Sequence, residues 1–189
     1  MDTKNTMAYP GKTIVNPLSG QELKFLRTSK DTQGQLLEME ARYPAHSKEP
    51  APHFHPEQDE FFEVLDGEMT VRIHGGLQVL RKGDKLHIPR GTVHSMWNHR
   101  DHPTLVSWKV VPAMDTEQFF ETFYGLAAEG KVNASGKPGL LQMALTMNRF
   151  NRVFRPVKPP YRVISILFWI LTPVAWLAGK KAVYSRYLE

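Results

Sequence analysis

Short apolar runs, rich in β-branched and aromatic residues, alternate with turn residues over the first part of the chain. The runs cover residues 22–27, 35–43, 60–65, 68–73, 85–88, 93–98 and 105–111. Turn sequences such as Asp66-Gly67, Gly75-Gly76 and Lys82-Gly83-Asp84 separate them. Strands this short, with no helical pattern between them, predict an antiparallel β-sandwich or barrel.

The pattern becomes helical after Pro112. The segment from Asp115 to Gln118 has the form of a capping box, aromatic residues follow it at helical spacing, and Gly130 is a stop signal. A second helical pattern comes next. We therefore expect an all-β barrel domain over residues 1–112 and an α-helical extension over residues 113–189.

One apolar segment within the extension, residues 163–178, contains no charge. As a helix it would be about 24 Å long, which is short of the roughly 30 Å hydrocarbon core of a bilayer. Basic residues lie on both sides of it: Arg155, Lys158 and Arg162 before, and Lys180, Lys181 and Arg186 after. The segment could span a membrane, lie on one, or pack against protein. The basic flanks favour membrane association.

Composition and charge narrow the choice of function. The chain has 189 residues and no cysteine, which excludes disulfide scaffolds, thiol nucleophiles and cysteine-ligated metals. Residues 1–145 carry 16 Lys and Arg against 18 Asp and Glu, whereas residues 146–189 carry 8 against 1. The net positive charge is thus confined to residues 146–189, and we expect no nucleic-acid partner. The first ten residues lack an apolar signal region, so we expect a cytoplasmic protein.

Side chains that bind metals are concentrated in two segments. In the first, His53 and His55 are one residue apart, so an extended strand points both the same way. Glu60 then shares a strand face with Phe62, where a carboxylate is costly unless a positive group pairs with it. A metal ion would supply that partner.

The second segment contributes His94, which shares a strand face with Met96 and Asn98. Three neutral imidazoles and one carboxylate form a ligand set suited to a divalent transition metal and too rich in nitrogen for Mg(II) or Ca(II). We favour Fe, Mn or Ni over Cu or Zn. Such a set leaves coordination positions open for a ligand.

Residues 53–67 and 83–98 resemble the paired motifs of the cupin superfamily. The first reads HxH, four residues, Glu, six residues, Gly, and the second reads Gly, five residues, Pro-x-Gly, two residues, His, three residues, Asn. The resemblance implies a cupin double-stranded β-helix, or small jelly-roll barrel, with these motifs on neighbouring strands. It implies four metal ligands, namely His53, His55, Glu60 and His94, with Gly67 and Gly91 as turn positions and Asn98 closing the second motif. Ser47 departs from the family's usual glycine at a turn outside the metal site.

Two functions are compatible with this resemblance and its implied metal ligands. The first is a mononuclear non-haem metalloenzyme acting on a small organic substrate, with dioxygenase-like chemistry similar to that of the quercetin dioxygenases. The resemblance then gives Glu60 two roles, metal ligand and general base. The second is a non-catalytic cupin that binds a small molecule or a structural metal and is placed at a membrane or partner protein by its tail. A homodimer is compatible with either.

Overall fold

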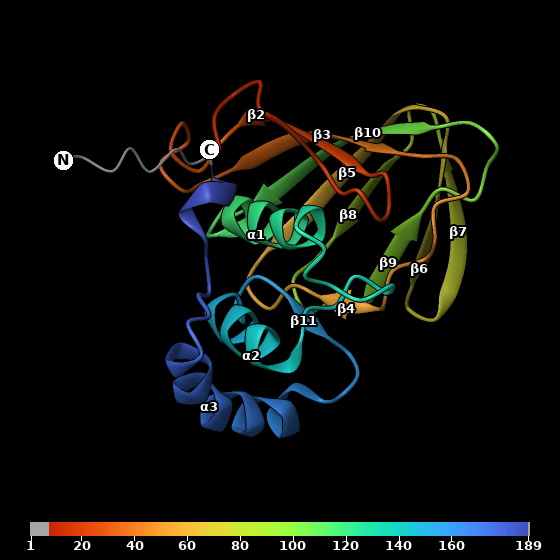
Figure 1. Cartoon of the computed structure of the whole chain (residues 1–189). Helices are drawn as coiled ribbons and strands as arrows, with labels where there is room; N and C mark the ends of the chain where they lie inside the picture. The colour runs from red at the N-terminus through yellow and green to blue at the C-terminus, as the bar shows by residue number, and fades with distance from the viewer. Residues whose placement is uncertain (1–7, 189) are drawn as a thin grey trace.

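A computed structural model describes residues 8–188, in which two antiparallel sheets form a barrel and three helices gather beside it (Figure 1). The first sheet has the order β1 (Thr13–Val15), β2 (Glu22–Arg27), β3 (Leu37–Tyr43), β10 (Thr104–Val111), β5 (Asp59–Asp66) and β8 (Lys85–Ile88). The second has the order β11 (Arg155–Pro156), β4 (His53–Phe54), β9 (His94–Trp97), β6 (Glu68–Ile73) and β7 (Gly76–Arg81). This β-rich jelly-roll arrangement confirms the expected barrel.

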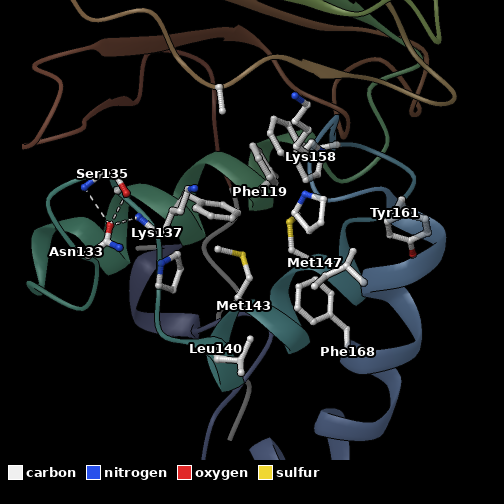
Figure 2. Close-up of a pocket in the computed structure, with 18 of the residues that line it drawn as sticks. Phe119, Asn133, Ser135, Lys137, Leu140, Met143, Met147, Lys158, Tyr161 and Phe168 are labelled. Atoms are coloured by element: carbon white, nitrogen blue, oxygen red, sulfur yellow. Dashed lines mark hydrogen bonds between the residues drawn. The ribbon is translucent and has the colours of Figure 1, made fainter.

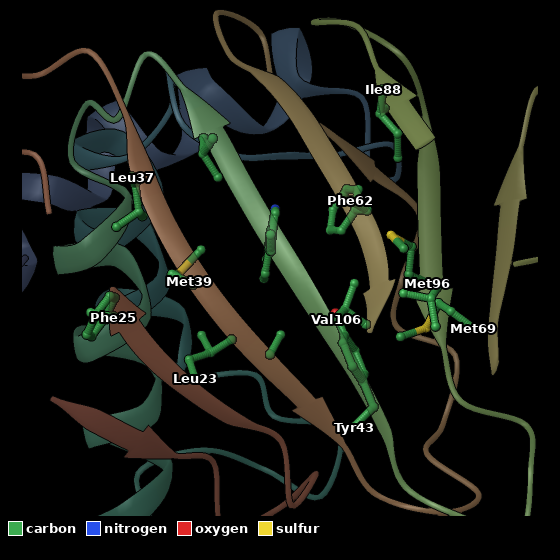
Figure 3. Close-up of a cluster of buried hydrophobic side chains, with 14 of the residues drawn as sticks. Leu23, Phe25, Leu37, Met39, Tyr43, Phe62, Met69, Ile88, Met96 and Val106 are labelled. Carbon is green, nitrogen blue, oxygen red and sulfur yellow. The ribbon is translucent and has the colours of Figure 1, made fainter. Parts of the chain in front are cut away.

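The hydrophobic core lies between the sheets because alternate residues of each strand point inward. In β3 and β10 every second side chain is buried, and the antiparallel register places Met39 opposite Trp108. Figure 3 shows this interior, with Leu23 and Phe25 from β2 at one end and Met69 and Met96 from the second sheet at the other. An apolar interior of this kind holds the barrel together without any ligand.

All seven strands predicted from the apolar runs are present, with ends within two residues of the prediction. Four further strands, β1, β4, β7 and β11, were not predicted. β7 is an edge strand in which only Leu80 is buried, so its sequence lacks the apolar alternation that identifies a strand. β4 and β11 have two residues each, too few to form a pattern.

The extension contains α1 (Thr116–Ala128), α2 (Leu140–Arg149), α3 (Tyr161–Leu177) and the short 3-10 helix η1 (Ser185–Tyr187). The predicted capping box at the start of α1 is wrong. Asp115 is the N-cap residue, but its side chain makes no capping bond and instead accepts a hydrogen bond of 2.6 Å from Nη1 of Arg149. Gly130 does follow the helix in a left-handed conformation, with φ of +65°.

The apolar segment forms α3, which packs against α2 along one narrow stripe. Only Phe168 and Ala175 of this helix are buried. Ile164 and Leu171 are half-buried against the same cluster, whereas most of its other large apolar side chains are exposed, including Trp169 at 73% and Leu177 at 91%. Among the described residues, no helix has the length and apolar character needed to cross a bilayer.

The extension also contributes to the barrel. β11 pairs with β4, so that Pro156 lies opposite His53 and Arg155 opposite Phe54. A buried ion pair attaches α1 to the start of the chain, with Nζ of Lys12 2.7 Å from Oε1 of Glu121. Residues beyond the predicted boundary at Pro112 therefore complete the second sheet beside the predicted metal ligands.

Candidate metal centre

Neighbouring strands bring the three predicted histidine ligands together at one end of the barrel. His53 of β4 and His94 of β9 are directly opposite each other in the antiparallel register, and His55 follows β4. The ligand nitrogens of the three side chains all lie within 4.8 Å of one another. They form a three-histidine cluster suited to a divalent metal ion.

Backbone carbonyl groups fix the orientation of each imidazole through its Nδ1 atom. The contacts are His53 Nδ1 to the Ala51 oxygen at 3.1 Å, His55 Nδ1 to the Val153 oxygen at 2.6 Å, and His94 Nδ1 to the Thr92 oxygen at 3.0 Å. A carbonyl oxygen can only accept, so each Nδ1 is the donor and carries the proton. The lone pair of each neutral imidazole is then at Nε2, and such partners both orient histidine ligands and set their tautomer.

Glu60 of β5 lies against the cluster from the other sheet and is only 1% exposed. Its Oε2 atom is 3.2 Å from Nε2 of His55 and 3.1 Å from Nε2 of His94. Its Oε1 atom accepts a hydrogen bond of 3.0 Å from the indole nitrogen of Trp108. One carboxylate oxygen is thus anchored while the other faces the histidines.

The local electrostatics favour the metal-binding protonation states of Glu60 and His53, whereas the adjacent Glu60 carboxylate raises the pKa of His94. Burial opposes ionisation of Glu60, but the adjacent imidazoles of His55 and His94 outweigh it and lower the pKa of the carboxyl to about 2. Burial, together with the neighbouring imidazoles, lowers the pKa of His53 to about 3. Near neutral pH the carboxylate is ionised and the His53 imidazole is neutral, as a divalent ion requires of its ligands.

Unsatisfied polar atoms test whether these residues fit a metal. Nε2 of His55 and Oε2 of Glu60 are buried and make no hydrogen bond within the described chain. Leaving buried polar atoms without partners costs on the order of 1–3 kcal/mol each. A cation bound between them would satisfy both at once. The residues therefore fit a single divalent transition metal, with nitrogen donors from three histidines and an oxygen donor available from Glu60.

The glycines of the two motifs occupy turns that need them. Gly67 has φ of +80°, and a β-carbon there would lie 2.9 Å from the backbone oxygen of Pro103. Gly91 has φ of +78° and donates its N–H to the His55 oxygen at 2.8 Å. Asn98 is buried and bonds the Pro44 and His102 oxygens through Nδ2, so it closes the loops around the second motif.

Three groups at the centre were not predicted from the sequence: the Trp108 indole, the Val153 carbonyl and the Phe154 ring. Phe154 stacks on His53 with ring centroids 4.8 Å apart. Trp108 lies two residues from Val110, which pairs with Glu60 across adjacent strands, and this register is seen only in the structure. Val153 and Phe154 lie about 100 residues from the histidines in sequence, and no local pattern indicates their contact.

Two cavities adjoin the centre on different sides. One of about 600 Å³ lies between the helices and is bounded by Phe154, the residue that stacks on His53. The other, of about 550 Å³, is bounded by His94, Arg72 and Arg90. These two arginines are paired with acids, Arg72 with Glu49 at 2.7 Å and Arg90 with Asp59 at 2.9 Å. The second cavity is therefore largely neutral.

Comparison with known proteins agrees with this geometry. Residues 39–110 match the family model described as the cupin domain. Residues 39–110 are thus a cupin domain, and the three histidines of its two motifs come together in a cluster that could hold a metal ion.

Several curated proteins are similar to it. It is 27% identical over 139 residues to oxidoreductase iacF of Pestalotiopsis fici, an alignment covering 68% of this chain and 67% of that protein. It is 33% identical over 106 residues to quercetin 2,3-dioxygenase of Bacillus subtilis, covering 56% of this chain and 31% of the relative. The chain thus spans about a third of the length of the quercetin dioxygenase.

Solved structures of cupins also resemble it. A cupin described as RmlC-like from Shewanella frigidimarina superimposes with a TM-score of 0.47 and 19% identity, covering 58% of this chain and 93% of that one. A structure described as a predicted oxalate decarboxylase from Thermotoga maritima gives a TM-score of 0.47 and 20% identity, covering 59% of this chain and 99% of that one.

Proposed function

We propose that this protein is a mononuclear metalloenzyme of the oxidoreductase type, with dioxygenase-like chemistry on a small organic enol or phenol. The observation that carries the proposal is the cluster of three histidine nitrogens within 4.8 Å of one another, with Oε2 of Glu60 next to His55 and His94. The oxidoreductase and quercetin dioxygenase names of similar proteins support it. We propose His53, His55, Glu60 and His94 as ligands of Fe, Mn or Ni.

When bound, the metal would act as a Lewis acid and a template for a substrate oxygen. The three histidines hold their Nε2 lone pairs in place through Nδ1–H bonds to fixed carbonyls. Trp108 holds one oxygen of Glu60, so the other can accept the hydroxyl proton of an enol. The lowered pKa of Glu60 keeps this oxygen unprotonated near neutral pH.

The test is oxygen uptake by full-length protein of measured metal content, using quercetin and simpler enols and phenols as substrates. The expected result is uptake that needs metal, falls at least 100-fold in Glu60→Gln, and is unchanged in His99→Ala. His99 is an exposed histidine close to the second motif and serves as the matched control. Absence of turnover by metal-loaded protein across the panel would contradict the proposal.

A second candidate function is a non-catalytic cupin that holds a structural metal. The closely packed barrel interior favours it, because Phe62 and Met96 are only 4% and 6% exposed. Protein that binds metal stoichiometrically, unfolds at a lower temperature when the metal is removed, and turns over no substrate would identify this function.

We also propose that α3 lies on an anionic membrane surface, with its exposed apolar side in the interface. Trp169, Ile170, Trp176 and Leu177 are exposed, although apolar groups of this size are usually buried. Exposed basic residues stand at both ends of the helix, with Lys158 and Arg162 at one end and Lys180 and Lys181 at the other. An apolar side with cationic ends suits an interfacial helix on negatively charged lipid.

Co-sedimentation of the full chain with phosphatidylcholine vesicles, with and without phosphatidylserine, tests this placement. Co-sedimentation should require phosphatidylserine in the vesicles. The double variant Trp169→Glu, Trp176→Glu should no longer co-sediment. Leu77→Glu, a change at an equally exposed apolar residue of β7, is the control and should leave binding intact. Equal sedimentation of all variants, or dimerisation lost only in the double variant, would contradict membrane binding.

A further inference from the structure

The cavity of about 600 Å³ between the three helices is built almost entirely by the extension (Figure 2). α1 contributes Phe119 and Phe123, α2 contributes Met143 and Met147, and α3 contributes Phe168. These residues all lie outside the cupin domain at 39–110. The cavity is therefore a feature of this chain's extension, and its volume is within the range of sites that bind small organic molecules.

Aromatic rings form much of its wall. The Phe119 ring is 4.6 Å from that of Phe123 and 5.2 Å from that of Phe154. Figure 2 shows Met143 and Met147 rising from α2 towards Phe119. Aromatic faces stack on flat rings, and methionine side chains adapt to irregular shapes. This lining selects an apolar ligand that contains aromatic rings.

The charged part of the lining is cationic. Lys137 and Lys158 border the cavity and are exposed, and none of its described lining residues is acidic. The turn that carries Lys137 is fixed by Asn133, whose Oδ1 accepts the backbone N–H groups of Ser135 and Lys137 at 3.0 Å each. Two ammonium groups beside an apolar, acid-free space are complementary to a carboxylate, sulfonate or phenolate.

Phe154 connects this cavity with the metal centre. The Phe154 side chain borders the cavity, and the Phe154 ring stacks on the His53 ring with an interplanar angle of 26°. The same ring is 6.3 Å from that of His55. The Phe154 side chain therefore lies between this part of the cavity and the ring of His53.

From the lining, the charge and this position, we infer that the cavity binds an aromatic organic anion beside the metal centre, with Phe154 as the wall between them. Binding of the anion stands on the cavity alone. It does not depend on the proposed function. A flat aromatic acid or phenolate would stack on the phenylalanines and direct its charge to Lys137 or Lys158, which border the cavity at separate places (Figure 2).

The probe for this site is 8-anilinonaphthalene-1-sulfonate, an aromatic anion whose fluorescence rises in apolar surroundings. Titration into the full chain should saturate at one molecule per chain. N-phenyl-1-naphthylamine, the matched neutral analogue, should bind about tenfold more weakly because it lacks the charged group. The double variant Lys137→Glu, Lys158→Glu should lose a similar factor for the anion and little for the neutral analogue.

Two further variants keep the test decisive. Met143→Trp fills the cavity and should abolish binding of both probes, whereas Lys82→Glu, in the turn between β7 and β8, should change neither. Circular dichroism spectra must match the parent chain, because this probe also binds partly unfolded protein. Equal affinity for the two probes, or binding unchanged by Met143→Trp in a folded protein, would overturn the inference.

Failure of the proposed function gives a different result. In His55→Ala and His94→Ala the anion should still bind with its parental affinity, since neither residue borders this cavity. Retained binding with no turnover by the metal-loaded parent would contradict the enzyme proposal and leave the cavity assignment standing. Turnover without saturable probe binding would support the enzyme proposal and contradict the cavity assignment.

Discussion

Trp108 donates its indole N–H to Oε1 of Glu60 across 3.0 Å, from the strand adjacent to that of the carboxylate. The register pairs Trp108 with Phe62 and Val110 with Glu60, so the indole reaches Glu60 diagonally across the sheet. This bond fixes the rotation of the carboxylate and leaves Oε2 facing His55 and His94. Trp108 is therefore a positioning residue for the proposed metal ligand.

Replacing Trp108 with Phe removes this donor and keeps an aromatic ring in the core. We expect metal affinity to fall about 10- to 100-fold, the range usual when a partner of a ligand is lost. Competition with a chelator of known affinity measures the change. Trp97→Phe, at a buried tryptophan of the other sheet that stacks with Arg72, is the control. Equal affinities for both variants would refute the positioning role.

Glu117 of α1 gives a prediction of pH dependence away from the metal centre. Burial, reinforced by the nearby carboxylates of Glu121 and Asp115, raises the pKa of Glu117 to about 7, even though its Oε1 accepts the Ser29 N–H. Between the unfolded value of 4.5 and 7 the folded state binds the proton more tightly. The contribution of Glu117 to the free energy of unfolding therefore falls as pH rises from 4.5 to 7.

Glu117→Gln keeps the acceptor for Ser29 and removes the ionisation. At about pH 8 the variant should be more stable than the parent by about 1–3 kcal/mol, and the difference should shrink towards zero as pH approaches 5. Urea denaturation at several pH values measures it. A difference that is the same at both ends of this range would show that Glu117 ionises normally.

Gly67 offers a test of the turn that closes the first motif. Gly67→Ala combines a left-handed φ of +80° with a β-carbon 2.9 Å from the Pro103 oxygen. We expect the free energy of unfolding to fall by about 2 kcal/mol or more. Gly75→Ala is the matched control, because it has φ of +78° with no atom within 4 Å of the added carbon. Equal losses in the two variants would mean that contact with Pro103 is unimportant.

The sequence predicted the parts of this molecule that local patterns encode. Alternation of apolar residues located the central strands of the barrel, and the motif spacing selected His53, His55 and His94, which the fold brings together. Strand alternation also placed Glu60 on an inward face. These features repeat every two residues or depend on short spacings, so a single sequence contains them.

The remaining features depend on contacts between distant segments. β11 pairs with β4, and Val153 orients His55, although about 100 residues separate the partners. The exposure of α3 was equally undetermined, since an apolar helix suits protein, membrane surface or bilayer alike until its neighbours are known. Residues 115–118 have the sequence of a capping box, but the Asp115 carboxylate pairs with Arg149 and makes no capping bond to the helix backbone. A tertiary contact here replaces the local one.

The most direct test of the metal centre is the metal content of purified full-length protein, measured by elemental mass spectrometry for the parent chain, His55→Ala, His94→Ala and the control His99→Ala. We predict one divalent transition metal ion per chain in the parent and in His99→Ala, and less than about one tenth of that in His55→Ala and His94→Ala. The β-sheet circular dichroism signal should be retained in all four proteins, because the core of the barrel is apolar. Full occupancy in both His55→Ala and His94→Ala would contradict the assignment of these histidines as ligands.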